Sequence, residues 1–325
     1  MKAFVYERYG APAEVMEQRE IEREAPGENR VEVRVRAASV NAYDWHLIRA
    51  DPFLVRVAGM GLFRPKRPRT GADFAGEVAA VGPGVEGFSV GDAVFGSAAP
   101  TGNGAFAEYV TVSPKFLARI PEGISFGVAA AVPMAALTAL QALRDTGKVQ
   151  KGQSVAVNGA SGGVGTYAVQ FAVALGAEVT AVCSAGKADR ARALGAHHVI
   201  DYRETDFTTT GAQYDLILGV NGYQHLKDYI RALKPQGTYV MVGGTNKQIM
   251  QGMLRTAMMN RRVPQTLATA MEKSNAADLE YVASLMTEGS VTSVIDREFA
   301  FEQTPAAVAY VEEGHAAGKV IITVA

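Results

Sequence analysis

The chain has 325 residues, of which 48% are hydrophobic and 20% charged, with a formal net charge of -1. This length predicts about two domains with substantial cores, and the composition excludes a wholly disordered chain. A net charge near zero argues against a nucleic-acid partner, and the single cysteine, Cys183, excludes an intrachain disulfide and a multi-cysteine zinc site.

The sequence predicts neither a secretion signal nor a membrane span. The first ten residues, MKAFVYERYG, lack the apolar core of a signal peptide. The longest apolar stretch, 128–143, contains polar residues and is too short to cross a bilayer. We therefore expect a cytoplasmic protein without a membrane partner.

The first third of the chain has the pattern of β-structure. Apolar and charged residues alternate with period two in RVEVRVRAASV at 30–40. Turn signals separate this segment from further short strands, expected at 1–6, 74–82, 92–96 and 106–112. Short strands at this spacing predict a barrel-like or sandwich domain.

Strands and helices alternate after the turn IPEG at 120–123. The expected strands are SVAVN, EVTAVC, HVIDY, DLILGV and TYVMVGG, and the expected helices span 164–175, 187–194, 223–233 and 249–259. This alternation predicts an α/β fold with a doubly wound parallel sheet. From about residue 276 a helix, a strand, a helix and the terminal strand KVIITV follow.

A glycine-rich loop joins the strand SVAVN to the next helix. It has the dinucleotide-binding pattern with alanine in place of the first glycine: Ala160, Ser161, Gly162, Gly163, Val164 and Gly165. Gly162 would let the backbone approach a pyrophosphate, and Gly165 would let the helix pack close to the strand. The helix N-terminus would favour the anionic diphosphate. The alternative is a glycine-rich turn that only packs two elements together.

The end of the second strand bears on the choice between NADH and NADPH. NADH sites carry an acid there, which binds the ribose 2′-hydroxyl. Here EVTAVC ends at Cys183 with no carboxylate at its tip, and Ser184 and Lys187 follow. A hydroxyl and a cation suit a 2′-phosphate, so the sequence predicts NADPH. The alternative for Lys187 is an ordinary solvated side chain.

Motifs along the whole chain carry a family resemblance: SVNAYDWHLIR, GADFAGEVAAVG, GDAVFG, GAFAEYV, AALTALQAL, NGASGGVG, LGAHHVIDY and GKVIITV. With these motifs the chain resembles the medium-chain dehydrogenase/reductase superfamily, in its zinc-free quinone oxidoreductase branch, the group that includes zeta-crystallin. The resemblance implies a GroES-like β-barrel catalytic domain formed by 1–122 and 271–325. A Rossmann NADP-binding domain at 123–270 would be inserted in it, and the protein would be a homodimer.

The resemblance also bears on zinc and on the reaction. Zinc-dependent members place Cys where this chain has Asn41 and His where it has Ala72. Catalytic zinc needs about three protein ligands, so we expect no metal. Without a metal to polarise an alkoxide, reduction of a conjugated acceptor is easier than alcohol oxidation. We expect NADPH-dependent hydride transfer to a small-molecule quinone or α,β-unsaturated carbonyl. The alternatives are an enoyl-thioester or alkenal reductase and a non-catalytic NADPH-binding module.

Site residues follow from the same resemblance. Asn41 would lie beside the nicotinamide and the substrate and could donate its amide N–H to the developing oxyanion. Tyr43, Asp44 and His46 could complete the polar site. Alternatively, Asp44 caps a helix that begins at Trp45, and Tyr43 is a packing residue.

Further coenzyme contacts are implied for Thr138, Tyr202, Val220, Val242, Gly243 and Lys319. Thr138 would contact the nicotinamide, unless its hydroxyl bonds its own helix. Tyr202 would lie near the 2′-phosphate. Lys319 would approach the coenzyme phosphates, unless it is a surface charge on the last strand.

The run 51–70 resembles an insertion. We expect it to cover the site and to favour a bulky apolar substrate through its apolar side chains, namely Phe53, Leu54, Met60, Leu62 and Phe63.

Overall fold

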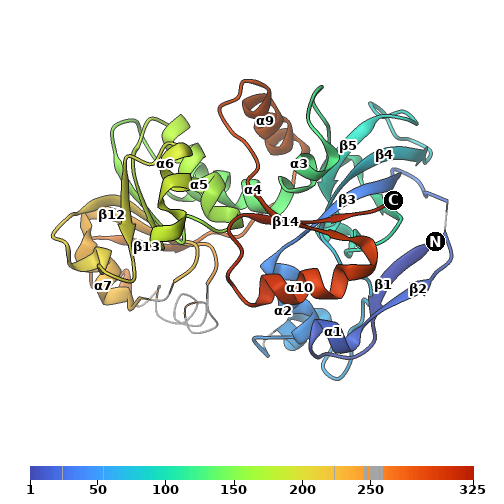
Figure 1. The fold of residues 1–325 in the computed structure, drawn as a ribbon, viewed down its shortest axis with the longest axis horizontal. Helices are drawn as coiled ribbons and strands as arrows, with labels where there is room; N and C mark the ends of the chain where they lie inside the picture. Colours follow the sequence, from blue (N-terminus) through green and yellow to red (C-terminus); the bar gives the residue numbers. More distant parts are fainter. Residues whose placement is uncertain (24, 54, 223, 245–247, 249–255, 257–258) are drawn as a thin grey trace. The chain divides into compact units, whose positions relative to one another are not determined.

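Figure 1 shows the computed structural model, which describes residues 1–325 except 24, 54, 223, 245–247, 249–255 and 257–258, and except the side chains of 58 and 59. The chain folds as two compact units: one combines Met1–Ala135 with Ser274–Ala325, and the other is Ala136–Lys273. The first unit thus runs past residue 122, where the sequence pattern placed its end. The helix predicted at 249–259 falls mostly outside the described residues.

The first unit is built around β3 (Val31–Val40), whose alternating pattern was recognised in the sequence. In the described part of the chain it belongs to a sheet with the strand order β14-β15-β3-β4-β5-β7, and β6 also pairs with β3. The remaining strands of this sheet are β4 (Asp73–Val81), β5 (Ala93–Ser97), β6 (Tyr109–Val112), β7 (Leu117–Arg119), β14 (Ile295–Ala300) and β15 (Lys319–Thr323). A separate antiparallel pair joins β1 (Lys2–Tyr6) to β2 (Met16–Glu20).

The C-terminal segment completes the first unit. β15 pairs antiparallel with β3, so that Val320 lies opposite Val40, and β14 pairs with the other edge of β15; Figure 1 shows the C-terminus near β3. The first unit therefore combines an N-terminal and a C-terminal segment of the chain. The helices of this unit are α1 (Pro12–Val15), α2 (Ala42–Arg49), α3 (Phe126–Ala130), α9 (Ala276–Thr287) and α10 (Thr304–Glu312). The helix α4 (Pro133–Gln141) spans the division between the units.

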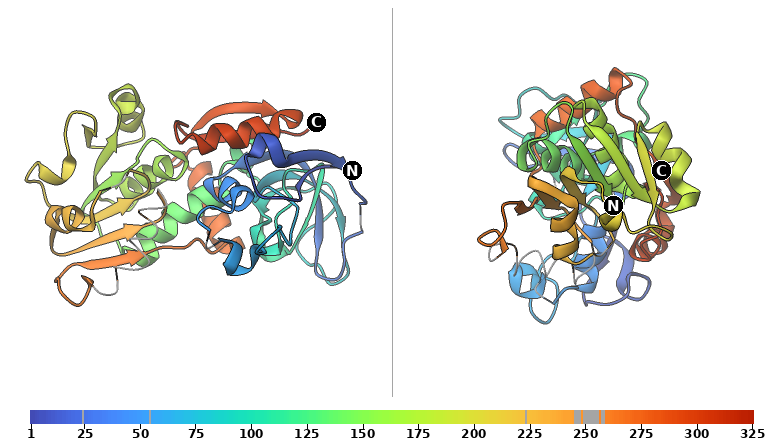
Figure 2. Two further views of the ribbon diagram at one scale, coloured as in Figure 1. Left: turned by 90° about the horizontal axis from the view of Figure 1, so that it is seen from below. Right: turned by 90° about the vertical axis from the view of Figure 1, so that its left-hand side faces the viewer.

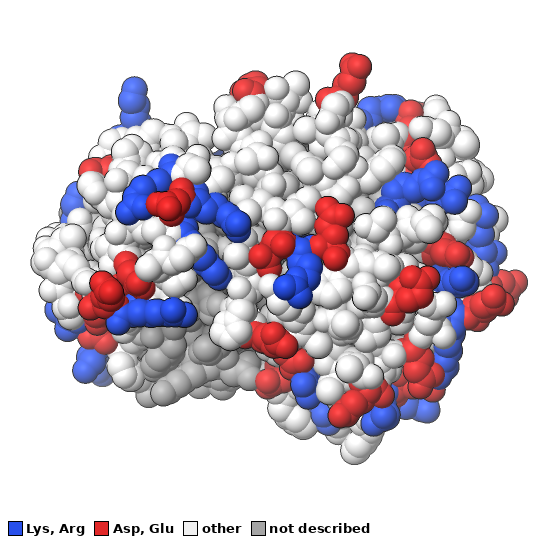
Figure 3. Space-filling view, in the orientation of Figure 1, with Lys and Arg blue, Asp and Glu red and all other residues white. Residues whose placement is uncertain are grey.

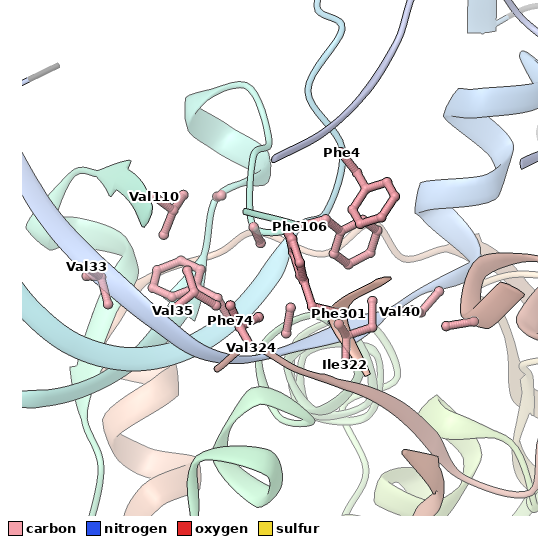
Figure 4. Packing of buried hydrophobic residues seen from close by; sticks show 14 of the residues in the cluster. Phe4, Val33, Val35, Val40, Phe74, Phe106, Val110, Phe301, Ile322 and Val324 are labelled. Atoms are coloured by element: carbon pink, nitrogen blue, oxygen red, sulfur yellow. The ribbon is translucent and has the colours of Figure 1, made fainter. Parts of the chain in front are cut away.

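Apolar side chains from these strands form one core. Figure 4 shows Phe74 from β4 and Ile322 from β15 within it, together with Phe106 and Phe301. Phe4 and Phe301 meet edge to face with ring centroids 5.2 Å apart, a favourable arrangement for aromatic rings. This core holds the end of β3, and with it the start of α2, in a fixed place.

The second unit is a doubly wound parallel sheet, as the alternation of elements predicted. Its described strands lie in the order β10-β9-β8-β11-β12-β13, which numbered along the chain is 3-2-1-4-5-6, the Rossmann order. Figure 2 shows them side by side in one layer. The bounds are β8 (Ser154–Asn158), β9 (Glu178–Cys183), β10 (His198–Asp201), β11 (Tyr214–Gly219), β12 (Leu233–Met241) and β13 (Thr266–Thr269), with the helices α5 (Gly163–Ala174), α6 (Ala188–Ala193) and α7 (Leu226–Ala232).

Several boundaries differ from the sequence predictions. α2 begins at Ala42 rather than at Trp45, β12 begins at Leu233, five residues before the predicted 238, and α7 begins at Leu226 instead of 223. Cys183 is buried at the end of β9, and burial raises the pKa of its thiol, as expected of a packing residue and not of a nucleophile.

On the face shown in Figure 3, acidic and basic side chains are interspersed. None of the helices within the described ranges combines the length and the apolar character that crossing a bilayer requires.

Candidate active site

Asn41 stands at the junction between β3 and α2. Its backbone is extended (φ -120°, ψ 159°), and it is the N-cap of α2. The backbone N–H of Asn41 donates to Asp44 Oδ2 at 2.8 Å, and the backbone of Ala72 also donates to this carboxylate. Asp44 is the third residue of α2, and its carboxylate caps the start of the helix by accepting the N–H of Asn41, the N-cap residue. The alternative drawn from the sequence instead placed Asp44 itself at the N-cap, before a helix that begins at Trp45. A catalytic role for Asp44 stays a prediction.

The Asn41 side chain turns away from the helix and lies between two charged groups. Its Oδ1 accepts a hydrogen bond from Lys319 Nζ at 2.5 Å, and its Nδ2 donates to Asp73 Oδ2 at 2.9 Å. Lys319 Nζ also donates to the carbonyl of Val40 at 3.3 Å and lies 4.0 Å from Asp73 Oδ2. The backbone N–H of Met134 donates to the same carboxylate oxygen at 3.0 Å. The sequence did not single out Asp73, although an acid in the apolar strand DFAGEVAAV is a signal of a buried partner.

The charged groups of this cluster are almost fully buried. Asp73 has an exposed fraction of 0% and Lys319 of 3%. Burial raises the pKa of Asp44 to about 7 and that of Asp73 to about 6, even though the Lys319 ammonium acts against the shift of Asp73. Burial also lowers the pKa of Lys319. The cluster is thus a buried ion network whose charge state changes near neutral pH.

Replacing Asp44 with asparagine tests the raised pKa. Between pH of about 4 and about 7 folded wild type keeps a proton on Asp44 that the unfolded chain has lost. The stability of wild type relative to Asp44→Asn should therefore fall as the pH rises through this window, by roughly 2 to 4 kcal/mol, and level off above it. Melting temperatures of both proteins at several pH values measure this. A difference in melting temperature between the two proteins that stays constant from pH 4 to 8 would contradict the raised pKa of Asp44.

Of the other two polar residues predicted in this segment, His46 is tied to local structure. His46 Nδ1 donates to the carbonyl oxygen of Asp51, and its ring stacks on Trp45 with centroids 3.6 Å apart. Burial lowers the pKa of His46. Tyr43 is half-buried on the first turn of α2. Their catalytic roles stay predictions.

In the second unit the glycine loop follows β8 directly. A Cβ on Gly165 would lie 2.1 Å from the carbonyl oxygen of Gly159, so the close packing of helix and loop excludes any side chain there. A Cβ on Gly162 would meet only the Gly159 oxygen, at 3.7 Å. Packing against the loop backbone therefore requires glycine at position 165. The space beside Gly162 is open, as expected if a ligand approaches the backbone there.

The start of α5 offers donors to an anion. Gly162 is the N-cap, without a side-chain capping bond, and the first turn contains no acidic residue. The N–H groups of Gly163, Val164 and Gly165 are first-turn groups that have no acceptor within the helix. The N–H of Ala160, by contrast, donates to the Val182 carbonyl at 3.1 Å.

Ser184 and Lys187 begin and end a short 3-10 turn after β9 (Ala185–Lys187, with Ser184 as N-cap), and Tyr202 follows β10 with 57% of its surface exposed. A carboxylate lies beside them, which the sequence reading missed. Asp201 is paired in register with Cys183, and its Oδ2 accepts from the backbone N–H of Ala185 at 3.1 Å. The acid absent from the tip of β9 is therefore supplied by the neighbouring strand.

The remaining predicted coenzyme residues divide between the units. Val220 follows β11, and Val242 and Gly243 follow β12, so they lie at the same carboxyl edge of the sheet as the glycine loop. Thr138 is buried in α4, and its hydroxyl has no hydrogen bond to another described residue, its own helix included. Lys319 belongs to the Asn41 cluster of the first unit.

The fold family implies two bound groups, a dinucleotide and a zinc ion, and the residues present suit only the dinucleotide. A dinucleotide fits the second unit, because an open backbone at Gly162, a helix N-terminus and strand ends with polar side chains meet at one sheet edge. Zinc does not fit. At the Asn41 cluster an amide and an ammonium lie against the Asp73 carboxylate, and neither group is a ligand of the kind that zinc takes in proteins. Within the described ranges, no three His, Cys, Asp or Glu side chains gather in a way that could hold a metal ion.

The run 51–70 exposes several apolar side chains. Phe63 has an exposed fraction of 88%, and Phe53 and Leu62 are also exposed, whereas Met60 is half-buried. Leu54 lies outside the described residues. The covering role predicted for this run stays a prediction.

Comparison with known proteins gives matches over the whole chain. Models of an alcohol dehydrogenase GroES-like domain and of a zinc-binding dehydrogenase match residues 27–122 and 194–322. A chloroplast envelope quinone oxidoreductase homolog of Arabidopsis thaliana is 31% identical over 337 residues, covering 99% of this chain and 98% of the relative. The structure of the quinone oxidoreductase from Coxiella burnetii has a TM-score of 0.88 and 29% identity, covering 100% of this chain and 99% of that one. An NAD-dependent alcohol dehydrogenase structure follows with a TM-score of 0.85 and 29% identity, covering 100% of both chains.

Proposed function

The chain belongs to the medium-chain dehydrogenase/reductase superfamily and has quinone oxidoreductases among its relatives, and on this premise we propose that it is a zinc-independent reductase that transfers hydride from NADPH to a quinone or an α,β-unsaturated carbonyl. Its relatives support an oxidoreductase that uses NAD(P)H. Its relatives include an alcohol dehydrogenase, so family membership leaves the acceptor open. The observation that carries the finer statement is the Asn41 amide, held between Lys319 and Asp73 where zinc-dependent members have a metal ligand.

The amide suits the charge that develops during reduction of a conjugated acceptor. When bound, NADPH supplies the hydride, and the negative charge is delocalised to the carbonyl oxygen of the acceptor. Asn41 has a second Nδ2–H, for which the described residues provide no acceptor. We assign this N–H to the acceptor oxygen, where a fixed donor stabilises charge without a metal ion.

The coenzyme would be held at the carboxyl edge of the second unit. The first-turn N–H groups of α5 and the open backbone at Gly162 suit a diphosphate. The hydroxyl of Ser184, the ammonium of Lys187 and the exposed ring of Tyr202 suit the 2′-phosphate of NADPH. Asp201 opposes the binding of this 2′-phosphate, because its negative charge repels a phosphate. Its Oδ2 also accepts the backbone N–H of Ala185, which is then not available to the phosphate.

Replacing Asp201 with asparagine should sharpen the preference for NADPH. Removing one negative charge near the 2′-phosphate should lower the Kd for NADPH by about 5- to 10-fold, while the Kd for NADH changes by less than about 2-fold. Coenzyme fluorescence titrations measure both constants. Asp189→Asn, at a carboxylate whose side chain is fully exposed, is the matched control and should leave both unchanged. Equal effects of Asp201→Asn on NADPH and NADH would show that Asp201 does not face the 2′-phosphate.

The function itself is tested by following NADPH absorbance with a panel of quinones, enones, alkenals and enoyl thioesters. The proposal expects turnover with quinones or enones. Turnover confined to enoyl thioesters or alkenals would favour the alternative reductase. Tight NADPH binding without consumption across the panel would favour the non-catalytic binding module.

We further propose a homodimer located in the cytoplasm. Light scattering on the eluting peak of a gel filtration column measures the mass of the particle directly. A mass near the 34.4 kDa of one chain would contradict the dimer.

A further inference from the structure

The partners of the Asn41 amide are charged groups of opposite sign, and this has a consequence for its orientation. An ammonium can only donate hydrogen bonds, and an ionised carboxylate can only accept them. The amide oxygen must therefore face Lys319 and the amide nitrogen must face Asp73, as the distances of 2.5 and 2.9 Å describe. A flipped amide would place its NH₂ group against the ammonium and its oxygen against the carboxylate.

The geometry ties Lys319 to this cluster. Its Nζ donates to the Asn41 amide and to the Val40 carbonyl, and Asp73 Oδ2 lies 4.0 Å away. With an exposed fraction of 3%, the side chain has little surface left for another ligand. A role through Asn41 fits these contacts better than the phosphate contact expected from the sequence.

We infer that Lys319 is a positioning residue: together with Asp73 it locks the Asn41 carboxamide, so that the remaining Nδ2–H is the group presented to the acceptor oxygen. This inference rests on the proposed function. Without Lys319 the amide oxygen loses its donor, and only the contact with Asp73 still restrains the amide, so that the remaining N–H is held less firmly toward the acceptor oxygen. The loss should fall on kcat and leave coenzyme binding intact, because the glycine loop belongs to the other unit.

The test is a double-mutant cycle of Lys319→Ala and Asn41→Ala in the full chain, with NADPH and the best acceptor of wild type. Lys319→Ala should lower kcat by about 10- to 100-fold, with the Kd for NADPH changed by less than about 3-fold. In the Asn41→Ala background the same change should cost less than about 3-fold, because Lys319 acts through the amide. Lys115→Ala, at an exposed lysine of the same unit, is the matched control and should behave as wild type.

A second readout separates the charge from the packing. n-Propylammonium has the size of the atoms that Lys319→Ala removes and should raise the kcat of this variant by about 5-fold or more, whereas 1-propanol fills the same space without charge and should not. If Lys319→Ala does not fold, Lys319→Met, which keeps the volume, takes its place in the cycle.

The inference requires both results. Additive effects in the cycle, an unchanged kcat in Lys319→Ala, or equal effects of the amine and the alcohol would each overturn it while leaving the proposed function intact. A wild type that consumes no NADPH with any acceptor would overturn the proposed function, and the inference would fall with it.

Discussion

Gly165→Ala should destabilise the nucleotide-binding unit severely and abolish NADPH binding. The new Cβ would lie 2.1 Å from the Gly159 carbonyl oxygen and 2.8 Å from backbone atoms of Ala160, and none of these atoms is the end of a flexible side chain. The loop or the helix must therefore move. Overpacking against backbone should cost about 3 kcal/mol or more, which corresponds to a fall of about 10 °C in the melting temperature of this unit.

Gly162→Ala is the matched control for this prediction. Gly162 has a φ of -82°, which any residue adopts, and its Cβ would have room. The variant should melt within about 2 °C of wild type, yet bind NADPH about 10-fold or more weakly, because the Cβ takes space that the diphosphate needs. Unchanged NADPH affinity in Gly162→Ala would mean that this loop is only a packing turn.

Asn41→Ala should lower kcat by about 100-fold or more with the same acceptor, since it removes the proposed donor to the oxyanion. The KM for NADPH should stay within about 3-fold of wild type, because the coenzyme loop lies in the other unit. Steady-state kinetics with NADPH and the best quinone or enone measure both parameters.

The fold of the variant must be checked, because Asn41 links the buried Lys319 and Asp73. Melting temperatures and circular dichroism provide this control. A folded Asn41→Ala protein with a kcat close to that of wild type would show that the amide does not stabilise the transition state.

Much of the second unit could be predicted from the sequence, because its determinants are local. The glycine loop, the helix that follows it and the alternating strands are each encoded in short contiguous segments, and the Rossmann strand order follows from them. β13 (Thr266–Thr269) was missed, and its four residues carry too little pattern to be recognised.

The Asn41 cluster could be predicted only in part, because its members come from distant parts of the chain. Asn41 directly follows β3, Asp73 begins β4 and Lys319 begins β15, and only the pairing of these strands brings the three side chains together. Asp201 was missed for a similar reason. Its position beside the end of β9 depends on the register between β9 and β10, which neither strand specifies alone.

Metal-free hydride transfer from NADPH is most directly tested by assaying protein that has been dialysed against a strong chelator and shown by elemental analysis to contain no zinc. We predict that it reduces a quinone or an enone with NADPH at the rate of untreated protein, and that added zinc does not raise this rate. Loss of activity on chelation that is restored by zinc, or no NADPH consumption with any acceptor, would contradict the account.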